Sequence, residues 1–255
     1  MITIDINCDL GEGFGLYKMG QDDELLSFIS SANIACGFHA GDPMIMNATI
    51  KKAKKKRVKI GAHPGFDDLH GFGRREMKVD IDEVKSLMFY QLGAIKAFCD
   101  YHQVPLNHMK PHGALYNMAA TDPSIARAIV EATKSFHSSL IIYGLANSEL
   151  IQACIDLNMP YAIEAFVDRT YQEDGTLTPR SLPFATIHSI EESVNQALSI
   201  IIHKKVKTAS GKMIPLEADT FCIHGDHENS VELASALRKT LIDHDIIIRG
   251  LGEQS

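Results

Sequence analysis

The chain begins MITIDINCDLGEGFG (residues 1–15), and this stretch gives the first indication of both the fold and the chemistry. Apolar and polar residues alternate up to Asp9, and such alternation is typical of a β-strand. Three glycines then surround Glu12, and glycine permits sharp turns and a close approach of the backbone to a ligand. The stretch therefore predicts a strand that ends by presenting two carboxylates on a glycine-rich turn.

Six further stretches are also short and apolar, and most of them end at Gly, Asp, His or Pro. Strands with these properties are typical of a buried parallel sheet. The seven predicted strands are ITIDINCD (2–9), SANIACGF (31–38), VKIGAHP (58–64), LNHMKPH (106–112), LIIYGL (140–145), YAIEAFVD (161–168) and TFCIHGD (220–226). DIIIRGL (245–251) is a candidate for an eighth or closing strand.

Helical patterns lie between these strands. Asp42-Pro43 and Asp122-Pro123 each place a capping aspartate before a proline at the first helical position. Further amphipathic patterns begin at Ile81, Ile190 and Val231. Alternating strands and helices imply βαβ units, and either a closed β/α barrel or a doubly wound sheet fits them. No linker divides residues 1–255, so we predict a single α/β domain.

Three segments do not read as simple connections between these elements. Residues 66–77 are rich in glycine and charge, and residues 170–183 contain an Asp-Gly turn and two prolines. Residues 204–215 contain Ser-Gly and predict a small hairpin. Long loops in compact domains often carry function, so we expect some of them to border a site.

Composition excludes several classes of partner. The 255 residues carry a formal net charge of −7, which disfavours nucleic acid and anionic membrane surfaces. The five cysteines are widely spaced and form no CxxC pair, which indicates free thiols in a reducing cytoplasm. No apolar run is long enough to span a bilayer. We therefore expect a cytoplasmic protein without nucleic-acid or membrane partners.

Polar residues gather where the predicted strands end. In a parallel α/β fold all strands end on one face, and the loops that follow them form the site. We therefore expect one shared cleft, lined by side chains from six separate segments. The candidates are Asn7, Asp9, Glu12, His39, His63, Lys110, His112, Glu164, Asp168, His224 and Asp226.

Two kinds of chemistry fit these residue types. Asp9, His39, His63 and His112 are ligands that a divalent metal ion accepts, although no HExxH motif accompanies them. Alternatively, carboxylates and imidazoles in a shared cleft exchange protons and orient water without a metal ion. Lys110 and the Arg74-Arg75 pair are suited to binding a carboxylate or a phosphate.

The sequence lacks the standard nucleotide-binding loops. Gly211-Lys212 is followed by Met213 and has no glycine five positions earlier, so it does not match GxxxxGK[ST]. The first turn, GEGFG, is not GxGxxG. Any ATP site in this chain would therefore be non-standard.

Eight stretches, spread over nearly the whole chain, resemble one known family. They are DINCDLGEGFG, SANIACGFHAGD, GAHPGFDD, GFGRR, KPHGALYN, EAFVDRTY, DGTLTPRS and CIHGD, and the family is LamB/YcsF. The resemblance implies a seven-stranded β/α barrel related to the glycoside hydrolase and deacetylase barrels. It also implies ATP-dependent hydrolysis of 5-oxo-L-proline (pyroglutamate) to L-glutamate, by an A subunit that works with separate B and C subunits.

With that substrate in view, each group of candidates receives a hypothetical role. We expect Lys110, Arg74 and Arg75 to bind anions. Asp9 and Glu12, with His39 and His63, then hold Mg²⁺ that accompanies ATP, or they move protons. His112 lines the cleft and completes the predicted catalytic set, which is Asp9, Glu12, His39, His63, Lys110 and His112. The remaining candidates are predicted to bind substrate or ATP: Asn7, Glu164, Asp168, His224 and Asp226, with Arg74 and Arg75.

Two other functions remain open on the sequence alone. The chain fits a metal-dependent deacetylase or another amide hydrolase, because such enzymes share the barrel and its Asp and His strand ends. It also fits a non-catalytic component that presents the substrate to its B and C partners.

Overall fold

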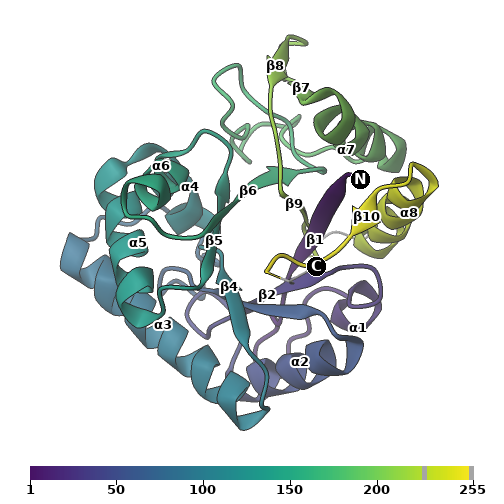
Figure 1. Cartoon of the computed structure of the whole chain (residues 1–255). Coiled ribbons are helices and arrows are strands. Elements are labelled where there is room, and N and C mark those ends of the chain that lie inside the picture. The colour runs from purple at the N-terminus through teal and green to yellow at the C-terminus, as the bar shows by residue number, and fades with distance from the viewer. Residues whose placement is uncertain (226–228, 253–255) are drawn as a thin grey trace.

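A computed structural model describes residues 1–225 and 229–252, and it contains a closed barrel of seven parallel strands with helices outside (Figure 1). Within this range the strands follow the order β1, β2, β3, β4, β5, β6, β9, and β9 pairs with β1 to close the barrel. Their bounds are β1 (Thr3–Leu10), β2 (Ser31–Ala35), β3 (Lys59–His63), β4 (Leu106–Met109), β5 (Ile141–Leu145), β6 (Tyr161–Phe166) and β9 (Thr220–Ile223). The barrel interpretation is thus confirmed, and the doubly wound sheet is excluded.

The helices cover the outside of the barrel, and two of them begin at the predicted aspartate caps. Asp42 Oδ1 accepts hydrogen bonds from the backbone N–H groups of Met44 and Ile45, at 2.8 and 2.9 Å. Asp122 caps the helix that follows it in the same way. The bounds are α1 (Asp22–Leu25), α2 (Pro43–Lys56), α3 (Ile81–Tyr101), α4 (Gly113–Thr121), α5 (Pro123–Phe136), α6 (Glu149–Asp156), α7 (Ile190–His203) and α8 (Ser230–Asp243).

Smaller elements complete the fold. The expected hairpin forms from β7 (Lys205–Lys207) and β8 (Met213–Pro215), which pair antiparallel. The candidate eighth strand is β10 (Ile247–Ile248), which pairs with the first residues of β1 outside the closed barrel. The sequence patterns do not predict α1, α4 and α6, because these helices have only four, nine and eight residues and so repeat the helical period at most twice.

The alternation in β1 distributes its side chains between two buried environments. Ile4, Ile6 and the other apolar residues of the strand belong to the hydrophobic core. Asp5, Asn7 and Asp9 point the opposite way, because alternate residues of a strand face opposite sides. All three bond to side chains from other strands, so the interior of the barrel is polar rather than hydrophobic.

This polar interior is a continuous hydrogen-bonded column. At its base, Asp5 accepts hydrogen bonds from the hydroxyl groups of Ser31 and Thr220, at 2.8 and 2.6 Å. Higher up, Asn33 donates to Asn7 Oδ1 at 2.7 Å and lies 2.8 Å from His108 Nε2. Buried polar groups are tolerated when they are hydrogen-bonded in this way. The column ends at the carboxyl ends of the strands.

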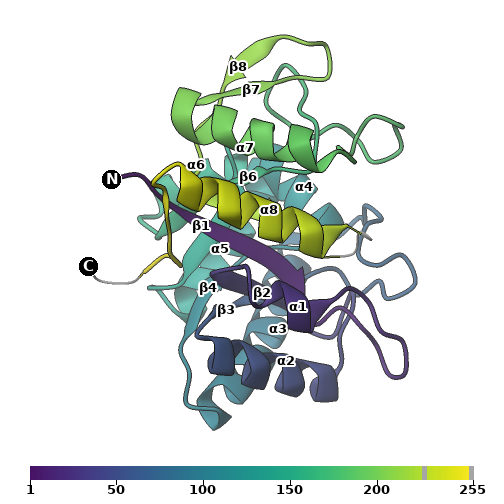
Figure 2. The same ribbon diagram turned by 90° about the vertical axis from the view of Figure 1, so that its right-hand side faces the viewer.

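Figure 2 shows β1 crossing the molecule from the N-terminus to the end of the barrel where the loop after β1 projects. That end is the face at which parallel strands deliver their following loops. The strand-end candidates of the sequence therefore lie at this mouth of the barrel. Among the described residues, no helix is both long and apolar enough to cross a membrane.

Candidate active site

A cleft of about 820 Å³ opens at the mouth of the barrel, and we call it the mouth cleft. Its size falls within the range of small-molecule sites. Residues at or just after the ends of β1, β3, β4 and β9 line it, as the strand-end argument predicts. The candidates that line it include Asp9, Glu12, His63, Lys110, His112 and His224.

Lys110, directly after β4, carries a buried ammonium group at the floor of the mouth cleft. Its Nζ atom lies 2.9 Å from Glu164 Oε1 and 3.1 Å from Asp9 Oδ1, and it donates to Cys222 Sγ at 3.0 Å. Burial alone would lower the pKa of Lys110, but the negative groups around it, Asp9 first, raise that pKa well above its ordinary value. Lys110 is therefore a fixed positive charge in a low-dielectric site.

Asp9 links this ammonium group to the imidazole of His63. Its Oδ2 atom lies 3.4 Å from His63 Nε2, while Oδ1 also accepts a hydrogen bond from Asn33 at 2.8 Å. Burial opposes the charge of Asp9, but His63 and Lys110 outweigh it and hold the pKa of Asp9 well below its ordinary value. Asp9 is therefore an ionised carboxylate shared between the ammonium group of Lys110 and the imidazole of His63.

His63 and His112 meet edge to face, with His63 Nε2 2.9 Å from His112 Nδ1. Each ring holds a backbone carbonyl with its other nitrogen: His63 Nδ1 lies 2.8 Å from the Lys110 oxygen, and His112 Nε2 lies 2.8 Å from the Phe72 oxygen. Because a carbonyl oxygen only accepts hydrogen bonds, these two nitrogens carry the protons. Both rings are thereby fixed in orientation.

His39 and Glu12 complete this group. The His39 ring stacks on His112 with 3.7 Å between ring centroids, and His39 Nε2 lies 3.5 Å from Glu12 Oε1. Burial lowers the pKa of His39 and of His112 well below the ordinary value, so both rings are neutral. We call Asp9, Glu12, His39, His63 and His112 the floor cluster.

Glycine makes this close packing feasible. Gly73 has a φ of +61°, and a Cβ atom added there would lie 2.7 Å from His39 Cβ and 2.9 Å from His112 Cδ2. Only glycine combines that backbone conformation with such a small volume. The GFGRR loop therefore presses its backbone directly against two of the histidines.

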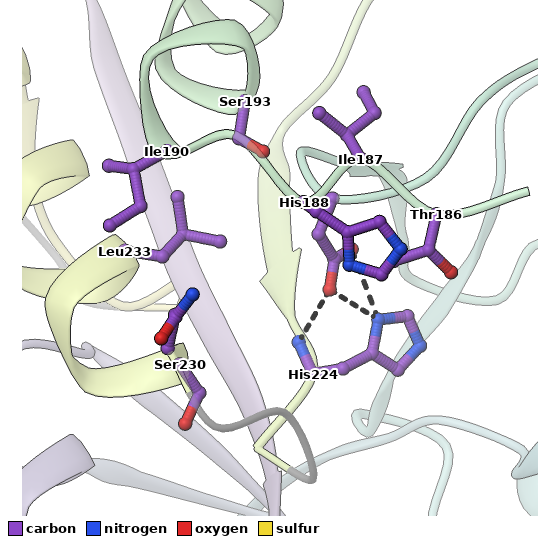
Figure 3. Close-up of a pocket in the computed structure, with 10 residues that line it drawn as sticks. Thr186, Ile187, His188, Ile190, Ser193, His224, Ser230 and Leu233 are labelled. Carbon is purple, nitrogen blue, oxygen red and sulfur yellow. Dashed lines mark hydrogen bonds and ion pairs between the residues drawn. The ribbon is translucent and has the colours of Figure 1, made fainter. Parts of the chain in front are cut away.

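Asp168 and His224 form a hydrogen-bonded pair at the edge of the mouth cleft. Figure 3 shows His224 where it borders a neighbouring, smaller pocket. His224 Nδ1 lies 2.8 Å from Asp168 Oδ2, and the His224 backbone N–H donates to the same oxygen at 3.2 Å. The pair borders a smaller pocket of about 270 Å³ between the start of α7 and the start of α8. His224 also lines the mouth cleft, where ligating atoms of His224, Asp9 and Cys222 lie within 4.8 Å of one another.

The structure thus gathers most of the predicted residues. Asn7 donates to Glu164 Oε1 at 3.0 Å beneath Lys110, so both belong to the interior column rather than to the lining of the cleft. Arg74 lines the cleft and lies over the Phe72 ring, whereas Arg75 turns away to an ion pair with Asp68. Asp226 lies outside the described residues.

Three residues of the site are not among the sequence candidates. His108 and Cys222 bond directly to residues of the site, and Arg180 lines the cleft. Asn33 and Arg169, which follow from the strand-end argument, also belong to the site. A signal for His108 was present, because it lies two positions before Lys110 and therefore on the same face of the chain. No comparable signal marks Arg180, whose place depends on the path of a long loop.

Comparisons with known proteins find relatives that match nearly the whole chain. The chain is 51% identical over 249 residues to the 5-oxoprolinase A subunit of Bacillus cereus (strain 03BB102), covering 97% of this chain and 98% of that protein. It is 48% identical over 251 residues to the protein of the same name from Tolumonas auensis, covering 98% and 100%. The shared name marks both relatives as one component of a multi-subunit enzyme.

Solved structures support the fold. The lactam utilization protein from Thermus thermophilus superimposes with a TM-score of 0.92 at 40% identity, covering 97% of this chain and 99% of that one. The T48 deacetylase superimposes with a TM-score of 0.50 at 14% identity, covering 97% and 87%, which shows a shared fold alone. The model of the LamB/YcsF family matches residues 4–255. The chain therefore belongs to the LamB/YcsF family.

Proposed function

We propose that this chain opens the lactam ring of 5-oxo-L-proline by hydrolysis to L-glutamate, as the A subunit of an ATP-dependent 5-oxoprolinase. The observation that carries the proposal is the convergence of Lys110 and His224 on one cleft, each already paired with a carboxylate. Hydrolysis of an amide needs a base for water and a cation for the carbonyl oxygen. The names of relatives about 50% identical over nearly the full chain supply the substrate.

In this proposal His224 is the general base. Asp168 holds the proton on Nδ1, so Nε2 of the neutral ring is the nitrogen that accepts a proton from the attacking water. Asp168 also stabilises the imidazolium that results. When the C–N bond of the ring breaks, His224 returns the proton to the ring nitrogen, which becomes the amino group of glutamate.

Lys110 stabilises the negative charge that develops on the carbonyl oxygen. Its ammonium group is fixed by Asp9 and Glu164 before the substrate arrives, so little reorganisation is needed during the reaction. Charge stabilisation of this kind is strongest where water is excluded, and only 3% of the Lys110 side chain is exposed.

In this proposal, arginines at the cleft bind the carboxylate of the substrate. Arg74 and Arg169 both line the mouth cleft, and Arg169 is held in place by hydrogen bonds to the carbonyl oxygens of Ala185 and Thr178. Guanidinium groups bind carboxylates and phosphates through paired hydrogen bonds. The same groups suit the phosphate of an O-phosphorylated lactam, the activated form that ATP would provide. From that form, cleavage of the C–N bond gives an acyl phosphate, with Lys110 facing the negative charge of its phosphate oxygens. A second water then releases phosphate and leaves glutamate.

We further propose that ATP and the B and C subunits complete the reaction, with Mg²⁺ accompanying the nucleotide. The absence of a standard nucleotide loop from the sequence supports a division of labour in which a partner handles the nucleotide. We place the reaction in the cytoplasm, because all five cysteines are buried free thiols that suit a reducing compartment.

The test is an assay of the chain purified together with its B and C partner proteins, measuring glutamate and ADP formed from 5-oxo-L-proline. We expect His224→Gln and Asp168→Asn to lower kcat by about 100-fold or more. The matched control His102→Ala removes a histidine that contacts Asn47 far from the cleft and should leave kcat within about twofold. Full activity in both cleft variants would contradict the assignment.

The same preparation separates the other functions. Hydrolysis of an N-acetylated sugar by the chain alone, without ATP, would indicate a deacetylase. Variants that weaken substrate binding yet leave kcat unchanged would indicate a protein that presents the substrate without acting on it.

A further inference from the structure

The contact between His63 and His112 has an unusual chemical consequence. Their facing nitrogens, His63 Nε2 and His112 Nδ1, are 2.9 Å apart, and each ring uses its other nitrogen as a donor to a backbone carbonyl. In the neutral rings, both facing nitrogens therefore carry lone pairs. Two lone pairs at this distance repel each other unless a proton or a metal ion lies between them.

Two carboxylates point at the same place. Asp9 Oδ2 lies 3.4 Å from His63 Nε2, and Glu12 Oε1 lies 3.5 Å from His112 Nδ1 and 4.0 Å from His63 Nε2. A tetrahedral Zn²⁺ with ligands at about 2.1 Å holds neighbouring donor atoms about 3.4 Å apart. The distances of the two histidine nitrogens from each other and from these carboxylate oxygens, 2.9 to 4.0 Å, are thus close to those of a metal site.

We propose that His63, His112, Asp9 and Glu12 bind one divalent transition-metal ion at the floor of the mouth cleft. The backbone carbonyls on His63 Nδ1 and His112 Nε2 act as the outer contacts that fix the orientation of metal-binding imidazoles. All four residues are among the candidate metal ligands of the sequence, and of those candidates the set leaves out His39.

His39 is the histidine of the floor cluster that does not join the proposed ligands. Its side chain is fully buried, and within the described part of the chain neither ring nitrogen has a hydrogen-bond partner. Its ring plane lies 3° from that of His112, so the two stacked rings do not point their lone pairs at one ion. We assign His39 to the wall of the site, where its Nε2 faces Glu12 Oε1 at 3.5 Å.

The donor set also selects the ion. Imidazole nitrogens suit Zn²⁺ and its transition-metal neighbours, whereas Mg²⁺ prefers a full set of oxygens. Lys110 lies 3.1 Å from Asp9 Oδ1, which leaves Oδ2 as the oxygen that faces the ion. When bound, such an ion supplies Lewis acidity at the floor of the cleft. The inference does not rest on the proposed ring opening, because metal binding needs neither substrate nor partner proteins.

The experiment uses the full chain after treatment with a chelator and titrates it with ZnCl₂ by calorimetry, and with CoCl₂ by visible absorption. We expect one equivalent of Zn²⁺ to bind, and Co²⁺ to give the absorption bands of a nitrogen-ligated site. His63→Ala and the conservative His112→Gln should each weaken Zn²⁺ binding by about 100-fold or more. His102→Ala, which removes a histidine outside the cluster, should bind Zn²⁺ like the wild type.

Circular dichroism and thermal melting verify that each variant is folded before titration. The proposal is overturned if the folded wild type takes up no stoichiometric Zn²⁺, which would leave a shared proton between the rings. It is also overturned if His63→Ala and His112→Gln bind Zn²⁺ as tightly as the wild type. A metal-loaded complex that forms no glutamate would instead contradict the proposed function and leave the metal site standing.

Discussion

Lys110 Nζ and Glu164 Oε1 lie 2.9 Å apart inside the barrel, where 3% and 0% of their side chains are exposed. The pair joins the end of β4 to the middle of β6, and Asn7 of β1 donates to the same Glu164 oxygen at 3.0 Å. Three strands that are distant in the sequence thus meet through one carboxylate oxygen. The floor of the site and the interior of the fold therefore share the same ion pair.

This arrangement predicts a large loss of stability from Lys110→Met. Removing one partner of a buried pair leaves the carboxylates of Glu164 and Asp9 uncompensated, which costs about 3–5 kcal/mol. Urea unfolding followed by circular dichroism measures the loss. The exposed pair of Lys96 and Asp100 is the control, because Lys96→Met should cost less than about 1 kcal/mol. If the two variants lost equal free energy of unfolding, the buried pair would contribute no more to stability than the exposed one.

The fold was largely predictable because its signals are local and repeated. Each strand is short and apolar, and Asp42 and Asp122 mark helix starts through their own capping hydrogen bonds. Because the loops after parallel strands meet on one face, the sequence predicts that Asp9, His63 and Lys110 share one cleft. These parts of the site follow from topology alone.

Other parts depend on details that no periodic pattern carries. Arg74 and Arg75 are neighbours, yet one lines the cleft and the other pairs with Asp68, because the loop before them has positive φ at Phe72 and Gly73. His108 shares a face with Lys110, but its bond to Asn33, on a different strand, could not be read from the sequence. Its role depends on partners from other strands.

His108 leads to a prediction about pH. Burial, assisted by Lys110, lowers the pKa of His108 to about 3, whereas in the unfolded chain it is about 6.5. Between about pH 3 and pH 6.5, His108 is protonated in the unfolded chain and neutral in the folded protein. The free energy of unfolding should therefore fall as the pH falls below about 6.5. The slope for this one histidine is at most about 1.4 kcal/mol per pH unit.

The measurement compares urea unfolding of the chelator-treated wild type and His108→Gln between about pH 7.5 and 5. The difference between the two curves isolates His108 from the other titrating groups. The free energy of unfolding of the wild type, relative to that of His108→Gln, should decrease as the pH falls. A difference that stays constant across this range would contradict the assigned pKa direction.

Replacing Gly73 or Gly93 with alanine should change the stability of the protein in opposite directions. Gly73→Ala places a methyl group against His39 and His112 at a φ of +61°, and should cost about 1–3 kcal/mol and displace both rings. Gly93→Ala, within α3, meets no heavy atom within 4 Å and should gain about 0.5–1 kcal/mol. Thermal melting of both variants, with the Zn²⁺ titration of each, tests the pair. A stable Gly73→Ala with unchanged Zn²⁺ binding would refute the packing argument.

Arg74 and Arg75 provide the sharpest test of the substrate contact, because they are adjacent, identical in chemistry and opposite in direction. Arg74 lines the mouth cleft, so Arg74→Ala should raise KM for 5-oxo-L-proline by about tenfold or more with a smaller change in kcat. Arg75 is 68% exposed and bound to Asp68, so Arg75→Ala should leave both constants within about twofold. Steady-state kinetics of the assembled complex separate the two outcomes. If Arg75→Ala raised KM as much as Arg74→Ala, the loop would have to present both guanidinium groups to the substrate, and the assignment of the carboxylate to Arg74 would fall.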